Sequence, residues 1–326
     1  MSTSTVNSEN GPGTEEEPVR ETDLRTPSRG VSKWGRESWV RRAPLLPALV
    51  FMIIVTQLPF VATLIMSFIS WSAAADAPPK KFAGLANFKQ VFTTPSYRQF
   101  VWNSVLMTVT IVAISALIGM GIALLLDHTF FGRGAVRTMM IAPFLIVPIA
   151  AAVFWGNGIV QTGFGLVDGL LGELGVNNAQ NIAFITDHPK LAIELELIWQ
   201  WTPFMMLILL AGLQSRDPET MEAASVDGAS TLQTFRYMTL PHMRRYLELS
   251  ITLGTIFIVQ NFDSVLGMTG GLNSTNIPYG VYEVFYSAHD YGVASALGVV
   301  VVIGSIAVAT FGLRVVSSLL TEEEAR

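Results

Sequence analysis

Long apolar stretches alternate with polar connections along most of this chain. A helix needs about 20 consecutive apolar residues to cross the core of a bilayer, and six segments reach that length. Pro143, Pro148 and Pro203 lie inside such segments, where neighbouring helices can satisfy the carbonyl groups that proline leaves free. The pattern predicts an all-α membrane protein with six transmembrane helices, expected over residues 43–71, 102–126, 138–160, 191–213, 246–267 and 292–316.

The two ends of the chain are polar. Residues 1–42 are rich in Ser, Thr, Glu, Gly and Pro, a composition that buries too little apolar surface to fold. The apolar run after Arg42 is too long for a cleaved secretory signal, so we expect it to stay as a membrane anchor. The sequence therefore predicts a disordered tail with a basic end over 1–42, a membrane domain over 43–316 that includes a loop at 214–245, and a short tail over 317–326.

Composition agrees with solvation by lipid. Hydrophobic residues make up 51% of the chain, charged residues make up 14%, and the mean hydropathy is +0.47, whereas soluble domains are about a quarter charged. The net charge of −5 gives no basic surface for nucleic acid. There is no cysteine, and the four histidines lack the spacing of a metal pair. We therefore expect no metal site and no catalytic residues.

Arginine and lysine indicate the orientation. They concentrate before the first span, between the second and third spans, and between the fourth and fifth spans, whereas the opposite connections hold fewer, among them Lys80, Lys81 and Lys89. Basic residues are enriched in cytoplasmic loops. We therefore expect a multi-pass protein with both termini and the 214–245 loop in the cytoplasm; the basic residues of that loop are Arg216, Arg236, Arg244 and Arg245.

The 214–245 loop is longer than a connector between two spans needs, because about four to eight residues usually suffice. Asp217 is placed to cap a short helix over 218–226 that starts with Pro218, and Asp227–Gly228 is placed to end it. A second short helix over 230–238 is expected to stop at Leu240–Pro241. Long structured loops are usually functional, so we interpret this loop as a docking surface.

The residues of this loop match a known signature. Glu222-Ala223-Ala224, with Gly228 four positions on and then Leu240-Pro241, resembles the EAA signature of permease subunits of ABC importers. All spacings are kept, and Met238 stands where isoleucine is usual, a volume-conserving change. The segments "WQWTPFMMLILLAGLQ" and "FDSVLGMTGGLN" look like the carbohydrate-uptake branch, as in maltose-type permeases, and "FRYMTLPHMRRYLELSITLG" looks closest to permeases for polyols such as mannitol and sorbitol.

The resemblance implies a type I ABC importer permease of the bacterial inner (cell) membrane. Its implied partners are two ATP-binding subunits that hold ATP and Mg²⁺, a second homologous permease and an extracytoplasmic solute-binding protein. This chain has no G-x-x-x-x-G-K-[ST] loop, so we expect it to bind no cofactor and to be no enzyme. The residues implied to couple to the ATPase are Glu222, Ala223, Ala224, Asp227, Gly228, Leu240 and Pro241.

Polar side chains within a span usually face the bundle interior or a cavity. Amides and a carboxylate can pair with hydroxyl groups, and aromatic faces can cover the C–H surface of a sugar or polyol. The alternative is that the polar residues only bridge helices. Glu194 and Glu196 are expected near the aqueous entrance of the fourth span. The candidate solute-pathway residues are Gln200, Trp201, Phe204, Phe257, Gln260, Asn261 and Asp263.

The resulting hypothesis is uptake of a polyol of the mannitol or sorbitol type by ATP-driven alternating access. One alternative is a disaccharide of the maltose or trehalose type. Another is a secondary transporter, which would need ion-coupling residues or a repeated half that the sequence does not clearly show. An intramembrane enzyme ranks last, because no set of catalytic side chains shares a helical face.

Overall fold

The structure is a computed structural model that describes residues 45–73, 80–175 and 183–324. Regular structure in these ranges is almost entirely helical, with one antiparallel pair of two-residue strands, β1 (Ile69–Ser70) and β2 (Lys81–Phe82). The all-α class is therefore confirmed. The chain divides into two compact units, residues 1–57 and 58–326. The core and the site lie in the second unit, and the predicted tail over 1–42 lies outside the described residues.

Three helices in the described ranges are long and apolar enough to cross a membrane. They are α2 (Leu46–Met66), α4 (Pro95–Asp127) and α9 (Pro189–Gln214), and they correspond to the first, second and fourth predicted spans. Both α4 and α9 have proline in their first turn, where its missing N–H costs no helical hydrogen bond. Pro203 lies inside α9, which stays helical through it.

The third predicted span, expected as one helix over 138–160, is broken into two helical parts. Helix α5 (Arg133–Leu145) and the pair α6 (Pro148–Phe154) and η2 (Trp155–Ile159) meet at 96°. The cause is local: the residue before a proline avoids helical backbone angles, and both Ile146 and Val147 are extended. Together α5 and α6–η2 still have the length and composition of one broken span.

The fifth and sixth spans also differ from the prediction at their ends. Helix α12 (Leu240–Ile258) ends nine residues before the predicted edge at 267, and a π-helical turn, η5 (Val265–Thr269), follows after a break. Helix α14 (Tyr291–Glu324) covers the sixth span and continues through most of the residues assigned to the C-terminal tail. The break coincides with the polar residues Gln260, Asn261, Asp263 and Ser264, which the predicted span includes.

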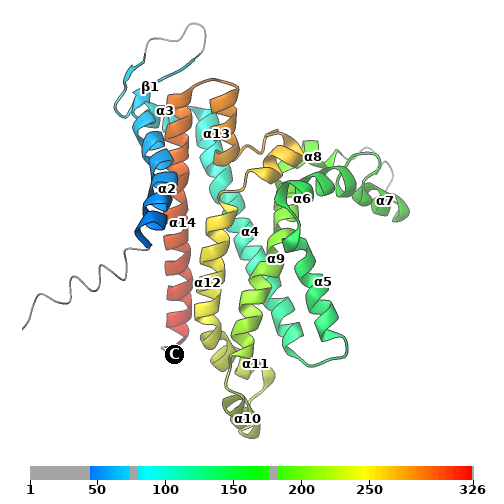
Figure 1. Cartoon of the computed structure of the whole chain (residues 1–326). Helices are drawn as coiled ribbons and strands as arrows, with labels where there is room; N and C mark the ends of the chain where they lie inside the picture. The colour runs from blue at the N-terminus through cyan, green and yellow to red at the C-terminus, as the bar shows by residue number, and fades with distance from the viewer. Residues whose placement is uncertain (1–44, 74–79, 176–182, 325–326) are drawn as a thin grey trace, which may run out of the picture. The chain divides into compact units, whose positions relative to one another are not determined.

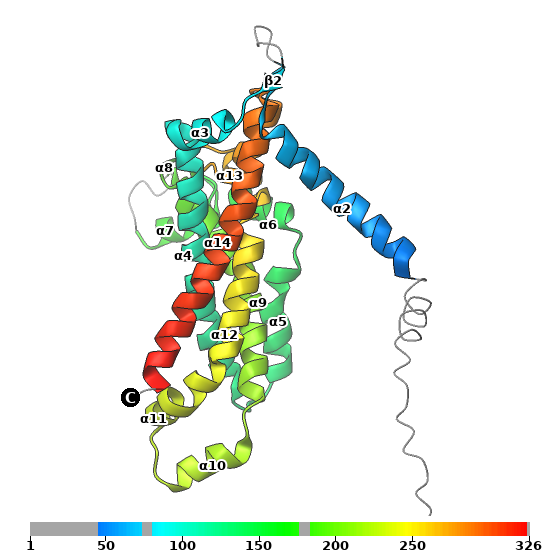
Figure 2. The same cartoon turned by 90° about the vertical axis from the view of Figure 1, so that its left-hand side faces the viewer.

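The short helices gather at the two ends of the second unit. The loop helix α10 (Pro218–Val226) lies at one end, beyond the ends of α9 and α12 (Figures 1 and 2). At the opposite end, α4 holds the segment before α13: Asn103 Nδ2 donates to Thr275 O at 2.8 Å, and Ile277 N donates to Ser104 Oγ at 2.7 Å. That end also contains α3 (Ala86–Thr93), α7 (Leu166–Glu173), α8 (Phe184–Asp187) and α13 (Ile277–Tyr286).

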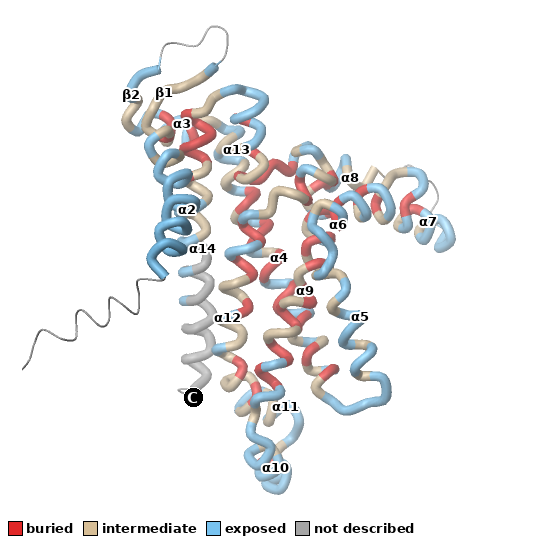
Figure 3. The backbone as a smooth tube through the Cα atoms, in the orientation of Figure 1, coloured by how far each residue is buried: buried red, intermediate tan, exposed pale blue. Residues whose placement is uncertain are grey.

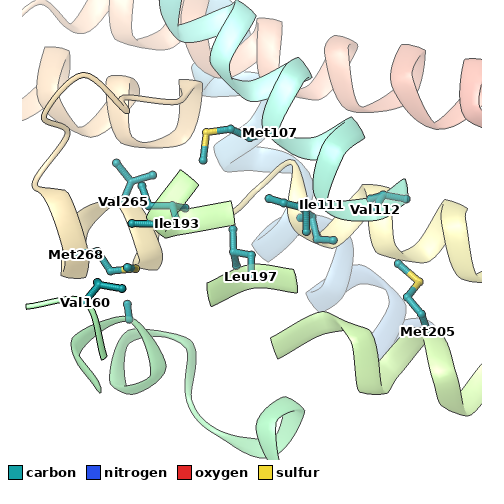
Figure 4. Packing of buried hydrophobic residues seen from close by; sticks show 12 residues of the cluster. Met107, Ile111, Val112, Val160, Ile193, Leu197, Met205, Val265 and Met268 are labelled. Carbon is teal, nitrogen blue, oxygen red and sulfur yellow. The ribbon is translucent and has the colours of Figure 1, made fainter. Parts of the chain in front are cut away.

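The core of the second unit centres on α4 and α9. Buried residues are frequent along both helices (Figure 3). Met107 and Ile111 of α4 pack with Leu197 and Met205 of α9, and Val265 of η5 belongs to the same cluster (Figure 4). This packing fixes α9, and α9 carries half of the candidate site.

Small residues allow α4 and α9 to approach closely, but only at one of two neighbouring glycines. A Cβ atom at Gly119 of α4 would lie 2.9 Å from the backbone nitrogen of Met206 on α9, so only glycine fits between the two backbones. Gly121 faces open space, because no atom lies within 4 Å of the position that a Cβ atom would take there. Gly119 therefore lies at the contact between α4 and α9, whereas Gly121, two residues further along α4, does not.

Candidate functional site

The predicted helix of the 214–245 loop forms as α10 (Pro218–Val226). Its cap is the predicted one, because Asp217 Oδ1 accepts the N–H of Glu219 at 3.1 Å. At the other end, Ala229 N donates to Ala224 O at 3.0 Å and Gly228 N donates to Ser225 O at 3.2 Å. The backbone of Gly228 is left-handed, with φ 79°. These contacts form a Schellman motif, in which the left-handed position favours glycine.

Helix α10 presents the predicted coupling residues to its surroundings. Glu222, Ala223 and Asp227 are exposed, whereas Ala224 is buried. An open pocket of about 350 Å³ adjoins the end of α10 and includes Tyr237 of the next helical segment. The pocket is lined by Asp227, Gly228, Ala229, Gln233, Thr234, Tyr237 and Met238.

The second helix of the loop does not stop at Leu240–Pro241, so that prediction is wrong. Helix α11 (Thr231–Thr234) begins with a capping box between Ser230 and Gln233, and the π-helix η4 (Phe235–Thr239) and then α12 follow without a gap. Pro241 lies in the first turn of α12, directly after the π-helical turn, where proline is tolerated. Leu240 and Pro241 are therefore part of one helical path that runs from Thr231 to Ile258.

Aromatic side chains from α9 and α12 meet in the membrane part of the second unit. The rings of Trp201 on α9 and Phe257 on α12 are stacked, with centroids 5.7 Å apart and planes at 20°. Phe204 on α9 lies edge-on to both, at 5.6 Å from Trp201 and 6.4 Å from Phe257. The three aromatic residues predicted from the sequence therefore do lie together.

Sequence analysis missed a fourth ring. Phe144 of α5 lies 5.6 Å from Trp201 and 5.3 Å from Phe204. The candidate residues all lie in the two spans next to the loop, whereas Phe144 belongs to the third span. The cluster of Phe144, Trp201, Phe204 and Phe257, here called the aromatic cluster, is open on one side, because Phe257 is 52% exposed. An open aromatic face can stack on the C–H surface of a ligand.

The predicted polar residues divide between two roles. Gln200 is buried, and its Nε2 donates to Ile146 O at 3.1 Å, so it ties α9 to the extended segment between α5 and α6. This contact fits the bridging alternative. Gln260 is exposed and lies three residues after Phe257, with its Nε2 donating to Ile256 O. Of these two amides, only Gln260 is exposed and so open to a ligand.

Asn261 and Asp263 lie beyond the end of α12. Asn261 Nδ2 donates to Ser264 Oγ at 3.2 Å, and Asn261 O accepts Asn276 Nδ2 at 2.6 Å, so this residue holds the break in place. Asp263 is half-buried.

Glu196 of α9 does not face an aqueous entrance, so that expectation is wrong. The residue is fully buried inside the unit, and neither carboxylate oxygen has a hydrogen-bond partner among the described residues.

Comparison with known proteins identifies the family. Residues 91–320 match the family described as "binding-protein-dependent transport system inner membrane component". The chain belongs to this family. As an inner membrane component of a transport system, the chain is a transport subunit, and the EAA resemblance of the 214–245 loop agrees with that membership.

Two curated relatives and one solved structure support the assignment. The chain is 31% identical over 268 residues to the "probable ABC transporter permease protein y4oQ" of Sinorhizobium fredii, covering 81% of this chain and 85% of that protein. It is 31% identical over 271 residues to the "trehalose/maltose transport system permease protein MalF" of Thermococcus litoralis, covering 81% and 89%. A chain of a bacterial ABC transporter involved in alginate import has the same fold, with a TM-score of 0.73, 19% identity, and coverage of 87% and 98%. The type I importer permease fold is thus confirmed.

Proposed function

We propose that this permease takes up an uncharged polyhydroxylated solute, a sugar or a polyol, by ATP-driven alternating access. The open side of the aromatic cluster carries the proposal. It offers ring faces for C–H surfaces. The exposed amide of Gln260 lies near Phe257 in the sequence and can pair with hydroxyl groups.

Two solute classes have separate support. The segment from Phe235 to Gly254 resembles polyol permeases, and this resemblance favours a mannitol- or sorbitol-like solute. The relative named as a trehalose/maltose permease favours a disaccharide to the same degree. Both classes present hydroxyl groups and C–H faces, so the aromatic cluster serves either.

Energy is proposed to come from partner subunits. We infer that two ATP-binding subunits, which hold ATP and Mg²⁺, receive α10, because α10 exposes Glu222 and ends beside an open pocket. On this inference α10 and both termini lie in the cytoplasm, which agrees with the basic residues of the loop. A second permease is proposed to close the exposed side of the aromatic cluster, and an extracytoplasmic binding protein to deliver the solute.

The test uses the complete transporter in proteoliposomes with its binding protein. Radiolabelled mannitol, sorbitol, maltose and trehalose are compared for uptake and for stimulation of ATP hydrolysis. Phe257→Ala and Trp201→Ala should lower uptake at sub-saturating solute about three- to tenfold, because an aromatic contact contributes about 0.5–1.5 kcal/mol beyond its area. Leu117→Ala is the control, since Leu117 is an exposed apolar residue of α4 outside the cluster.

The results separate the classes. Uptake of a polyol but not of a disaccharide selects the first solute class, and the reverse selects the second. Wild-type uptake by both aromatic variants would show that the aromatic cluster faces lipid or a partner instead of the solute. A response to none of the four solutes would reject the proposed substrate class.

A further inference from the structure

The junction between α9 and α10 is held by contacts that the EAA signature does not include. Arg216, the second residue after α9, donates through all three guanidinium nitrogens. Nε donates to Leu213 O at 2.9 Å, Nη1 donates to Thr239 Oγ1 at 2.9 Å, and Nη2 pairs with the carboxylate of Asp127. These acceptors lie on α9, η4 and α4. One side chain therefore connects three helices next to residues 215–217, the link between α9 and α10 that is here called the root of α10.

The preceding residue is held in a similar way. Ser215 Oγ donates to Gly212 O at 2.8 Å and lies 2.7 Å from Tyr246 Oη and 3.0 Å from His242 Nε2. Gly212 lets α9 and α12 approach closely, because a Cβ atom there would lie 2.5 Å from the ring of Tyr246. The ends of α9 and α12 are thus joined both by side-chain hydrogen bonds and by direct packing.

These contacts are more than an exposed surface ion pair. The side chains of Arg216 and Asp127 are 17% and 21% exposed, and an ion pair that is partly removed from water is screened less than an exposed one. Arginine is suited to the position because its planar guanidinium offers donors in several fixed directions, whereas lysine offers one compact charge. Hydrogen bonds in several fixed directions hold the orientation of the three helices as well as the distance between them.

Helix α10 itself projects from this root. Glu222 is exposed, and Val226 near its end is 86% exposed. A force applied to α10 moves the transmembrane helices only if residues 215–217 keep their conformation. Without fixed contacts at the root, residues 215–217 would act as a flexible linker between α10 and α9.

We propose that Arg216 is a positioning residue that locks the root of α10 to α4, α9 and η4. Displacement of α10 by an ATP-binding subunit then moves these helices together. Arg216 need not touch the ATPase or the solute for this role. The inference rests on the proposed function, because it assumes that α10 is the element on which the partner acts.

The first experiment measures coupling in the complete transporter. Arg216→Ala, Arg216→Lys and Asp127→Asn are reconstituted with the partner subunits and binding protein, and uptake is divided by ATP hydrolysis for each. Glu248→Gln is the matched control, because it breaks the Arg244–Glu248 ion pair, which lies within α12 and joins no two helices. We expect Arg216→Ala to assemble, to hydrolyse ATP and to lose about tenfold in solute per ATP, with Arg216→Lys between it and wild type.

The second experiment reports on the lock directly. The chain has no cysteine, so Phe131→Cys beyond α4 and Val226→Cys on α10 can carry two spin labels, and both positions are exposed. The distance distribution between the labels should be narrow with Arg216 present and broad in Arg216→Ala. A purely local stabilising role would lower uptake and hydrolysis in step and leave this distribution narrow.

Parallel variants distinguish the two levels of failure. If Arg216→Ala does not assemble, Asp127→Asn and Thr239→Val, which each remove one partner, must show the lower solute yield per ATP. Wild-type coupling in the variants that assemble would overturn the inference. Glu222→Arg tests the proposed function separately. If Glu222→Arg loses uptake while the Arg216 variants keep normal coupling, only the positioning role of Arg216 is rejected. If Glu222→Arg keeps wild-type uptake, the docking of α10 is rejected.

Discussion

The contact between α4 and α9 can be tested with two glycines on the same helix. Gly119→Ala places a methyl group 2.9 Å from Met206 N and 3.0 Å from Met205 Cβ, and the nearest of these atoms belongs to backbone that cannot rotate away. Gly121→Ala places the same methyl group in open space. The two variants therefore share their chemistry and their helix and differ in what the methyl group meets.

The expected magnitude follows from this comparison. Alanine improves helix propensity by about 1 kcal/mol over glycine, but the gain is common to both variants and cancels in their difference. Overpacking a filled site costs about 1–3 kcal/mol. Gly119→Ala should therefore be about 1–3 kcal/mol less stable than Gly121→Ala.

Equilibrium unfolding of the purified permease in mixed micelles, titrated with sodium dodecyl sulfate, measures this difference. The seven tryptophans provide the fluorescence signal. Equal midpoints for the two variants would show that the backbones of α4 and α9 are not in contact at Gly119. A lower midpoint for Gly121→Ala than for Gly119→Ala would place the contact on the other face of α4.

Three further outcomes are expected. Gly228→Ala should weaken retention of the ATP-binding subunits on purification more than Gly228→Asn does, because left-handed backbone costs alanine about 1–2 kcal/mol and asparagine less; equal retention would contradict this. Ser104→Ala should lower the free energy of unfolding by about 1–3 kcal/mol in the same titration, because the buried N–H of Ile277 loses its acceptor; an unchanged midpoint would contradict it. Glu196→Gln should be at least as stable as wild type at pH 7 in the same titration, because glutamine cannot ionise and a buried charge is costlier than a buried neutral group; a large loss of stability would show that the Glu196 carboxylate accepts hydrogen bonds within the permease.

Sequence patterns predicted α10 closely because its signals are local. Asp217, Pro218 and Gly228 act on neighbouring backbone groups, so the start, the cap and the end of this helix follow from short-range rules. The rule for Pro241 failed for a physical reason. A proline stops a helix when it removes an interior hydrogen bond, but here it occupies the first turn after a π-helical turn, where it is tolerated. Residue type alone does not distinguish these two cases.

The solute pathway was harder to predict because it depends on which way each helix faces. Trp201, Phe204 and Phe257 were found because they lie on the helices that flank the loop. Gln200 has the same sequence context, yet its side chain turns to Ile146 O. That acceptor is free only because the third span is bent. Tertiary structure therefore decides which polar residues bridge helices and which remain open.

The aromatic cluster and the root of α10 are connected by two uninterrupted helices. Helix α9 runs from Trp201 to its end beside Ser215 and Arg216. At about 1.5 Å of rise per residue, this part of the helix is about 20 Å long. Helix α12 runs from Phe257 back to His242 and Tyr246, which contact Ser215. Trp201 and Phe257 therefore lie on two helices, α9 and α12, that contact each other again at Ser215, His242 and Tyr246.

Such an arrangement limits how the site can change. On the proposed mechanism, the ends of α9 and α12 stay joined, because they are packed through Gly212 and bonded through Ser215. We therefore expect a displacement of α10 to move Trp201 and Phe257 together. Phe144 is different: it lies on α5, which ends at the 96° bend and contacts the cluster from the side. On the proposed mechanism, the opening and closing of the aromatic cluster is then a movement of the α9–α12 pair against α5 and against the second permease, while the stacked rings keep their distance.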